Sequence, residues 1–452
     1  MKIWKTPERP NISIRSIEVR NFRRFERFFI DFHPEMTVLV APNGQGKSSI
    51  LDAISVAVSP FVAAFDLGKG RGITKSDARY QRQEQSLSSE QMFPVEIEAN
   101  FAELPSYTKR ALIGPKGKTT NKDASELSAY GSHLMLLVRS LEPVVLPVVA
   151  HYGTGRLWQE HKNMARKSVL SESRTMGYED CLTTASNYKQ LQQWFTKATY
   201  AELQQQQMAD VYQGYSLKSL MLGIQSTVER VLMPSTGWQQ FHYSLSHEEL
   251  AMSHPEQGIL PMSLLSDGVR AMVSLVSDLA WRCAKLNPHL GIKAPLETPG
   301  LVLIDEVDMH LHPDWQQTVL TSLHAAFPKV QFIVTTHSPQ VISTVRTESI
   351  RILGQNVEGH EIAAMPLAST YGEPSNRVLQ TVMQVDPQPP IAEKNDLKRL
   401  TELVDQGQGE ADEANALMQT LLGVLGDTHP QLQRLRRSIE RQKRLAGWSD
   451  QL

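Results

Sequence analysis

A glycine-rich loop between a predicted strand and a predicted helix constrains this chain more than any other stretch. The loop reads Ala-Pro-Asn-Gly-Gln-Gly-Lys-Ser-Ser over residues 41 to 49. An apolar run at 36 to 40 precedes it and predicts a buried strand, and residues 50 to 57 follow with helical periodicity. This order of strand, loop and helix is the context that a phosphate-binding loop requires, and a glycine-rich structural turn is the alternative.

Each part of this loop has a chemical use. The glycines let backbone N–H groups turn towards phosphate oxygens, and the start of the helix adds a partial positive charge. Lys47 is expected to bridge the outer phosphates, and Ser48 to offer its hydroxyl to magnesium. Ala41 stands where the motif expects glycine, which is tolerable if its φ is negative. The predicted ATP-binding residues of the loop are Asn43, Gly44, Gln45, Gly46, Lys47, Ser48 and Ser49.

Two further apolar runs end in polar side chains. Residues 301 to 304 lead into Asp305 and Glu306, and residues 330 to 336 lead into His337. Open α/β sheets bind ligands at the carboxyl ends of their parallel strands. The pattern therefore predicts a magnesium and water site at Asp305 and Glu306, with a strand running into an acidic loop as the alternative. His337 is expected to reach the outermost phosphate, unless it is a structural histidine.

A second candidate anion site lies in the turn Leu-Ser-Asp-Gly at 265 to 268. A strongly helical stretch from 271 to 286 follows this turn. The hydroxyl of Ser266 and the N–H groups that open the helix would face an anion. An N-capped helix without a ligand is the alternative.

Composition narrows the class of protein. The chain has 452 residues, which predicts two or three lobes, and a net charge of −2. Any nucleic-acid contact must then come from a local patch or from a partner. Cys181 and Cys283 lie far apart without metal-ligand spacing, which indicates a reducing compartment. No window reaches the length of a membrane span, so we expect a cytoplasmic protein without a membrane partner.

The pattern of apolar residues predicts four segments. They are an α/β lobe in two parts, at 1 to 156 and 241 to 373, a helical insertion at 157 to 240, and a helical C-terminal extension at 374 to 452. Besides the strands named above, strands are predicted at 12 to 19, 28 to 32, 94 to 101, 134 to 139 and 144 to 150, and loops at 68 to 90 and 109 to 128.

Two stretches carry positive groups without a settled role. The predicted loop at 109 to 128 holds Lys116, Lys118 and Lys122, which either contact nucleic-acid phosphates or are solvated. The stretch from His151 to Arg156 follows a predicted strand and is a candidate source of a positive group near the nucleotide.

The four motifs together resemble those of the ATP-binding cassette (ABC) ATPases. Their order and spacing are most similar to the soluble branch that includes the RecF and SMC proteins, as are Asn-Phe-Arg at 21 to 23 and Thr-His-Ser-Pro at 336 to 339. The resemblance implies an α/β P-loop NTPase head with a mixed sheet flanked by helices, a helical insertion and a helical C-terminal extension. It also implies ATP hydrolysis, with ATP and Mg²⁺ bound.

The resemblance implies a role for each motif residue inside one subunit. Lys47 would hold the phosphates, and Ser48 and Asp305 would bind Mg²⁺. Glu306 would polarise the attacking water, and His337 would contact the γ-phosphate.

The resemblance also implies a contribution across a dimer. Ser266 and Gly268 would complete the ATP site of a second subunit, so the chain is expected to form oligomers built on ATPase dimers. Asp267 stands where glycine is usual, a substitution often met in this branch. The glutamine that would supply a further magnesium ligand is not placed by the sequence.

A narrower similarity links the chain to the PtuA family, the ATPase subunits of Septu-type antiphage systems, whose relatives accompany some retrons. It rests on residues 146 to 158, on Tyr-Gly at 371 and 372 with Asn376 and Arg377, and on the C-terminal helices. This similarity implies a subunit that senses infection and regulates an HNH nuclease (PtuB-like), with DNA reached through the complex. A stand-alone RecF-like ATPase of DNA repair or chromosome maintenance is the alternative.

The last predicted helix, 431 to 445, is strongly basic. Leu432, Leu435 and Ile439 share one face, and six Lys and Arg residues lie elsewhere on the helix. Either the helix packs on neighbouring helices with a solvated basic face, or the basic face docks a partner protein or nucleic acid.

Overall fold

The structure is a computed structural model that describes residues 10–82, 89–104, 106–157, 173–184, 188–207 and 217–449. The chain forms two units, Met1–Met383 and Gln384–Leu452. The C-terminal extension was predicted to begin at residue 374. Helix α10 (Ser375–Thr381) nevertheless packs on α9 (Pro339–Ile342), and its Val378 is fully buried in the core of the first unit.

A six-stranded mixed sheet runs through the first unit. Its strand order is β15-β14-β3-β13-β12-β8, and only the pairing of β15 with β14 is antiparallel. The strands are β3 (Met36–Val40), β8 (Val148–Tyr152), β12 (Gly300–Ile304), β13 (Val330–Thr336), β14 (Ile350–Gln355) and β15 (Glu361–Ala364). Every residue of β8, β12 and β13 is buried, as expected for parallel strands covered on both faces. The predicted mixed α/β sheet is confirmed.

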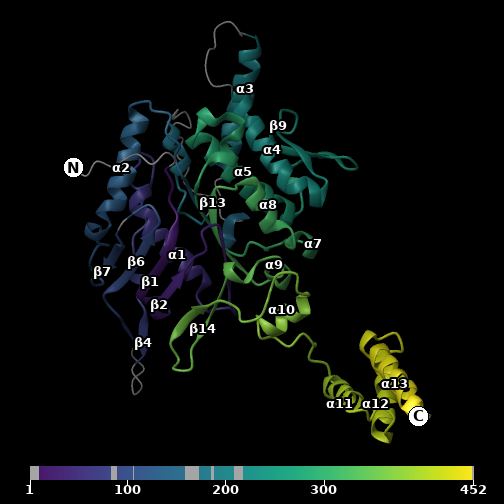
Figure 1. Cartoon of the computed structure of the whole chain (residues 1–452). Coiled ribbons are helices and arrows are strands. Elements are labelled where there is room, and N and C mark those ends of the chain that lie inside the picture. Colours follow the sequence, from purple (N-terminus) through teal and green to yellow (C-terminus); the bar gives the residue numbers. More distant parts are fainter. Residues whose placement is uncertain are drawn as a thin grey trace. The chain divides into compact units, whose positions relative to one another are not determined.

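A second, antiparallel sheet has the order β2-β1-β6-β7. It consists of β1 (Ile14–Phe22), β2 (Phe25–Asp31), β6 (Val95–Phe101) and β7 (Thr108–Leu112). Helix α1 (Lys47–Val62) contacts β6 and β7 of this sheet and also β8 and β13 of the mixed sheet (Figure 1). The helix that follows the glycine-rich loop is therefore held between the two sheets.

Other helices flank the mixed sheet. Helix α5 (Asp267–Leu286) packs on β8 and on α4 (Leu217–Thr236), and α4 in turn contacts α3 (Tyr188–Gln207) and α8 (Val319–Ala326). Short helices α6 (Ala294–Glu297) and α7 (Pro313–Gln316) lie in the connections before and after β12. A three-stranded antiparallel sheet of β9 (Gln239–Ser244), β10 (Glu249–His254) and β11 (Gly258–Pro261) precedes α5.

A buried ion pair fastens α5 to its surroundings. The guanidinium of Arg282 lies 2.8 Å from the carboxylate of Asp278, and both side chains are buried. Tyr152 of β8 donates its hydroxyl to the same Asp278 carboxylate at 2.7 Å. Arg282 also donates to the carbonyls of Gly177 and Glu179, at and just after a 3-10 turn, Arg174–Tyr178. One carboxylate oxygen of Asp278 thus has two hydrogen-bond donors, while its other oxygen is buried without a hydrogen-bond partner. The close positive charge of Arg282 offsets the cost of burying this carboxylate.

The strand predicted at 134 to 139 is wrong, because these residues end a helix, α2 (Ser125–Arg139). Its buried residues include Leu127, Tyr130, Gly131 and Leu134, whose spacing of three and four marks one helical face. A Cβ at Gly131 would lie 2.7 Å from Ala64 Cβ, so glycine allows α2 to approach α1 closely. The apolar residues at the end of α2 fit the pattern of a strand if the preceding helical turns of α2 are not considered.

The two predicted loops contain regular structure as well. Residues 68 to 90 include β4 (Tyr80–Arg82) and the start of β5 (Ser89–Gln91), which pair antiparallel. Residues 109 to 128 include most of β7 and the first turn of α2. Within the predicted helical insertion at 157 to 240, α3 and α4 are helical. No helix in these ranges or elsewhere in the described residues could span a membrane, by length and hydropathy.

The second unit is a group of three helices with a core of its own. They are α11 (Lys394–Asp405), α12 (Asp412–Leu425) and α13 (Pro430–Ser449). The core residues are Leu397, Leu400, Leu403, Val404, Ala414, Met418, Leu421, Leu432 and Leu435. Helix α13 includes the last helix predicted from the sequence, 431 to 445.

Candidate nucleotide-binding site

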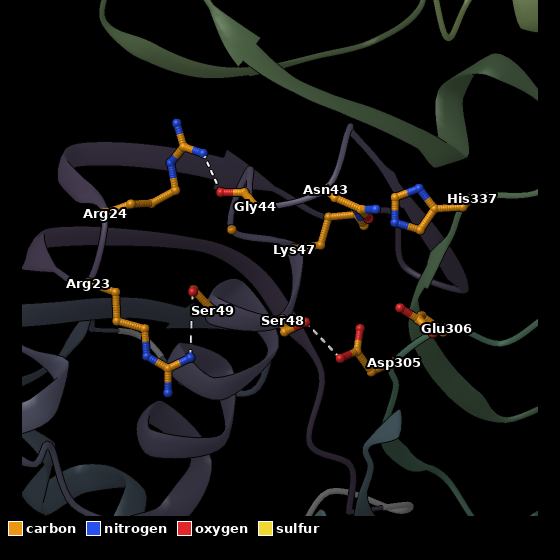
Figure 2. A pocket seen from close by; sticks show the side chains of 11 residues that line it. Arg23, Arg24, Asn43, Gly44, Lys47, Ser48, Ser49, Asp305, Glu306 and His337 are labelled. Carbon is orange, nitrogen blue, oxygen red and sulfur yellow. Dashed lines mark hydrogen bonds between the residues drawn. The ribbon is translucent and has the colours of Figure 1, made fainter. Parts of the chain in front are cut away.

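A polar pocket of about 370 Å³ lies at the carboxyl edge of the mixed sheet. Strand β13 pairs with both β3 and β12, so the chain segments that leave these three strands emerge side by side. Figure 2 shows the side chains that they bring together. The lining residues are Arg23, Arg24, Asn43, Gly44, Gly46, Lys47, Ser48, Ser49, Asp305, Glu306 and His337. Nine of these were predicted, whereas the predicted Gln45, Ser266 and Gly268 do not line the pocket.

The backbone of the loop has the conformation that phosphate binding needs. Gly44 and Gly46 have φ values of 76° and 92°, in the left-handed region that favours glycine. A Cβ at Gly46 would also lie 2.5 Å from the ring of Phe25, so no larger residue fits there. Ala41 is not among the residues with positive φ, which meets the condition for replacing glycine at that position.

The ammonium group of Lys47 is held inside the loop. Its Nζ donates to the carbonyls of Ala41 at 2.8 Å and Pro42 at 3.3 Å, and the residue is buried. Burial lowers the pKa of Lys47, and the nearby carboxylates of Asp305 and Glu306 oppose that shift. A phosphate would therefore meet a positive group that is already oriented by the loop.

Asp305 is fixed by two hydroxyl groups. Ser48 Oγ donates to one carboxylate oxygen at 2.7 Å, and Thr335 Oγ1 donates to the other at 2.6 Å (Figure 2 shows the first bond). The backbone N–H of Glu306 donates to Thr335 Oγ1 at 2.7 Å. Glu306 itself has φ +47°, a strained conformation that is typical of functional sites. Thr335 was not predicted, although it is a polar residue near the carboxyl end of β13.

These oxygen atoms fit a magnesium ion. Mg²⁺ prefers hard oxygen ligands and usually binds through one or two protein groups together with substrate phosphates and water. Ser48 and Asp305 supply a hydroxyl and a carboxylate at contact distance of each other, beside the phosphate-binding loop. The donor set at this edge of the sheet is thus of the kind that Mg²⁺ takes in nucleotide sites.

His337 lines the same pocket, and Figure 2 shows its ring beside the side chain of Asn43. Burial lowers its pKa, and the positive charge of Lys47 lowers it further, while Glu306, Asp308 and Asp305 oppose the shift. The ring is therefore neutral at pH 7 and can donate a hydrogen bond to a phosphate oxygen without adding a charge.

Arg23 and Arg24 were not predicted as site residues. Both lie in the turn between β1 and β2, next to the loop. Arg23 is 2.7 Å from Asp52 and 3.0 Å from Asp77, and these carboxylates outweigh burial and raise its pKa. Arg24 donates to the carbonyl of Gly44 at 2.6 Å. Asn-Phe-Arg at 21 to 23 was the available signal, but a sequence does not show that this turn covers the loop.

Ser266 and Gly268 lie at the start of α5, outside the pocket. Ser266 is exposed and its side chain makes no capping hydrogen bond, so the simple N-cap alternative is not observed. A Cβ at Gly268 would lie 2.4 Å from the carbonyl oxygen of His310, so glycine lets α5 begin close to the loop that follows β12.

His151 does not supply a positive group to the nucleotide. It is buried in β8, its Nδ1 lies 2.9 Å from Ser55 Oγ, and burial lowers its pKa to about 4. The next residue, Tyr152, accepts a hydrogen bond at 2.8 Å from the N–H of Asp305. The segment that follows β8 thus starts beside the predicted metal ligand, but the side chain of Arg156 and residues 158 to 172 lie outside the described parts.

Two family models match the chain. One, described as "AAA domain", matches residues 16 to 218 and includes the glycine-rich loop. The other, described as "AAA domain, putative AbiEii toxin, Type IV TA system", matches residues 202 to 343 and includes Asp305, Glu306 and His337. The chain has the fold of a P-loop ATPase. Its two matched parts meet at the pocket that the mixed sheet assembles.

The ATPase is similar to named proteins over most of its length. It is 26% identical to the "Retron Ec83 probable ATPase" of Escherichia coli, with 99% of this chain and 89% of the relative covered. It is 24% identical to the "Retron Vc95 probable ATPase" of Vibrio cholerae serotype O1 biovar El Tor, with 90% and 87% covered. The "Septu protein PtuA" of Bacillus mycoides (strain KBAB4) is 33% identical over 24% of this chain and 14% of the relative.

A likeness to a solved structure is more distant. An SMC head bound to the C-winged helix domain of ScpA covers 78% of this ATPase and 98% of the head, with a TM-score of 0.46 and 16% identity.

The buried His151 predicts a pH dependence of stability. Its pKa is about 4 in the folded chain and 6.5 in the unfolded chain, so only the unfolded state binds a proton between these values. The contribution is fully present above pH 6.5 and is lost as the pH falls towards 4. Between pH 7 and pH 5 this single group should lower the free energy of unfolding by about 2 kcal/mol.

Urea denaturation of the wild type and of His151→Gln at pH 7 and pH 5 measures this contribution. The variant should lose less stability than the wild type over this interval, by about the same 2 kcal/mol. His360→Gln, at an exposed histidine, is the matched control and should behave as the wild type. An identical pH response of all three proteins would show that His151 is accessible to protons in the folded state.

Proposed function

We propose that this ATPase is the ATP-hydrolysing subunit of a bacterial antiphage defence complex, in which its nucleotide state regulates an associated HNH nuclease. Similarity to two retron ATPases over nearly the whole chain supports the link to defence. The partial similarity to PtuA supports the same class. The nuclease is a proposal that follows from the resemblance to the Septu systems.

The observation that carries ATP hydrolysis is the bond between Ser48 and Asp305, which are 257 positions apart. It joins the phosphate-binding loop to the acidic end of β12, beside Glu306 and His337. Phosphoryl transfer to water depends mainly on positioning and on neutralising charge, and a pocket of this composition supplies both.

We assign a role to each group in this reaction. Lys47 binds the phosphates and offsets their charge, and His337 donates to the outermost phosphate. Ser48 and Asp305 would hold Mg²⁺, which when bound adds further charge neutralisation. Glu306, which lines the pocket next to Asp305, accepts a hydrogen bond from the attacking water and orients it.

The same proposal includes a dimer in which each subunit completes the other's site. Ser266 is exposed, uncapped and absent from the pocket of its own subunit. The N–H groups at the start of α5 do not line the nucleotide pocket of their own chain. In the proposed dimer they would instead face the phosphates of the nucleotide bound to the second subunit. Gly268 would let α5 present its first turn without a side chain in the way.

The first test of the roles uses two substitutions in the pocket. Glu306→Gln keeps the shape of the side chain but weakens its hold on water, so ATP should still bind while turnover falls by about 100-fold or more. Lys47→Ala should lose ATP binding itself. Nucleotide affinity by fluorescent ATP and turnover by phosphate release separate the two effects. Wild-type turnover in Glu306→Gln would remove Glu306 from the reaction.

A mixing experiment tests the dimer. Lys47→Ala and Ser266→Arg should each be inactive alone, since every dimer then lacks one half of both sites. Mixed and allowed to exchange, they form some dimers in which one site has an intact Lys47 and an intact Ser266. Turnover should then rise to about a quarter of the wild-type value, given random pairing with half of the dimers mixed and one working site in each. No recovery in samples shown to exchange subunits would contradict the shared site.

The regulatory role is tested in a host that carries the neighbouring genes. The tagged ATPase should copurify with a nuclease, and the nuclease activity of that complex should differ between wild type and Lys47→Ala. The exposed Lys329→Ala substitution is the control for charge removal. Copurification of no nuclease, with ATP-dependent DNA binding by the ATPase alone, would instead favour the RecF-like alternative.

A further inference from the structure

Helix α13 carries four arginines along one side. Arg434, Arg437, Arg441 and Arg444 are spaced by three, four and three residues. At 3.6 residues per turn this spacing places them within an arc of about 80°, along roughly 15 Å of the helix axis. All four are exposed, whereas Leu432 and Leu435 on the other side of the helix are buried. We refer to these four residues as the arginine stripe.

Three other cations of this unit form internal ion pairs. Lys443 pairs with Glu410, Arg399 with Glu413 at 2.6 Å, and Lys394 with Asp386 at 2.5 Å. Between residues 384 and 449 no ion pair joins a member of the arginine stripe to a carboxylate of the unit. The positive charge of the stripe therefore remains available to a ligand.

We propose that the arginine stripe binds the phosphate backbone of a nucleic-acid strand. Arginine matches phosphate oxygens with two parallel hydrogen bonds and stays charged at any physiological pH. One strand carries a phosphate about every 3.4 Å of helix axis, so the length of the stripe corresponds to about four or five phosphates. A row of guanidinium groups at intervals of about 4.5 to 6 Å suits such a linear polyanion.

The composition of this surface favours nucleic acid over a protein partner. Protein interfaces have an apolar core inside a polar rim. On α13 the one large apolar residue described as exposed is Leu445, beyond the last arginine of the stripe. The whole chain has a net charge of −2, so any affinity for nucleic acid has to come from such a local patch.

The experiment uses the full chain and three labelled probes of twenty nucleotides: single-stranded DNA, single-stranded RNA and duplex DNA. Anisotropy titrations at 50 to 200 mM salt give the affinity and its salt dependence. One variant carries Arg434→Gln, Arg437→Gln and Arg441→Gln. The matched control carries Lys116→Gln, Lys118→Gln and Lys122→Gln, which removes the same charge from the exposed basic loop of the first unit.

The wild type should bind at least one probe, and the stripe variant should bind it at least about tenfold more weakly at 50 mM salt. The slope of log affinity against log salt should fall by about 2 for a single strand or 3 for a duplex. The loop variant should stay within about twofold of the wild type. A third variant with lysine at the same three stripe positions should retain the salt slope, which separates loss of charge from damage to the helix.

Three outcomes would overturn the proposal. The wild type binds none of the probes at 50 mM salt; the stripe and loop variants lose affinity equally; or the stripe variant binds nucleic acid normally but loses its oligomeric mass or a copurifying protein. ATP turnover in all variants reports on the nucleotide site, so failure of the stripe proposal is distinguishable from failure of the proposed ATPase function.

Discussion

The bond between Ser48 and Asp305 is the contact on which the functional part of this structure depends. It exists because β13 lies between β3 and β12 and holds their ends at one edge of the sheet. Thr335, on β13, contacts the other oxygen of Asp305 and the N–H of Glu306. The three neighbouring strands thereby place the carboxylate of Asp305 within hydrogen-bond distance of the hydroxyl of Ser48.

Positive and negative side chains lie close together around the pocket. Lys47 is desolvated against carbonyl groups, while Asp305 and Glu306 stand opposite it. Removing water from such a site strengthens every remaining electrostatic interaction, and a triphosphate brings the negative charge that this arrangement accepts. The turn with Arg23 and Arg24 encloses the loop from the other side, so the phosphates would be met by cations from two separate parts of the chain.

Most residues of the site could be predicted from the sequence, because they occur in short motifs of neighbouring residues. The strands at 36 to 40 and 330 to 336 occur as predicted, and the glycine loop has the expected backbone. Sequence periodicity does not reveal the order of strands, so the roles of Thr335, Arg23 and Arg24 were missed. His151 was considered as a source of positive charge near the nucleotide, and its burial, which keeps it neutral, is set by neighbouring elements that a sequence does not show. The end of α2 was mistaken for a strand because a short apolar run fits either period.

The buried pair of Asp278 and Arg282 gives helix α5 a fixed position relative to the sheet. Tyr152, which bonds Asp278, ends β8, and its carbonyl accepts from the N–H of Asp305. Sliding or turning α5 would leave a charge without its partner in a dry interior, which costs several kcal/mol. The helix is therefore held in place against β8, with the exposed Ser266 just before its first turn and the strand beside the metal ligand at its side.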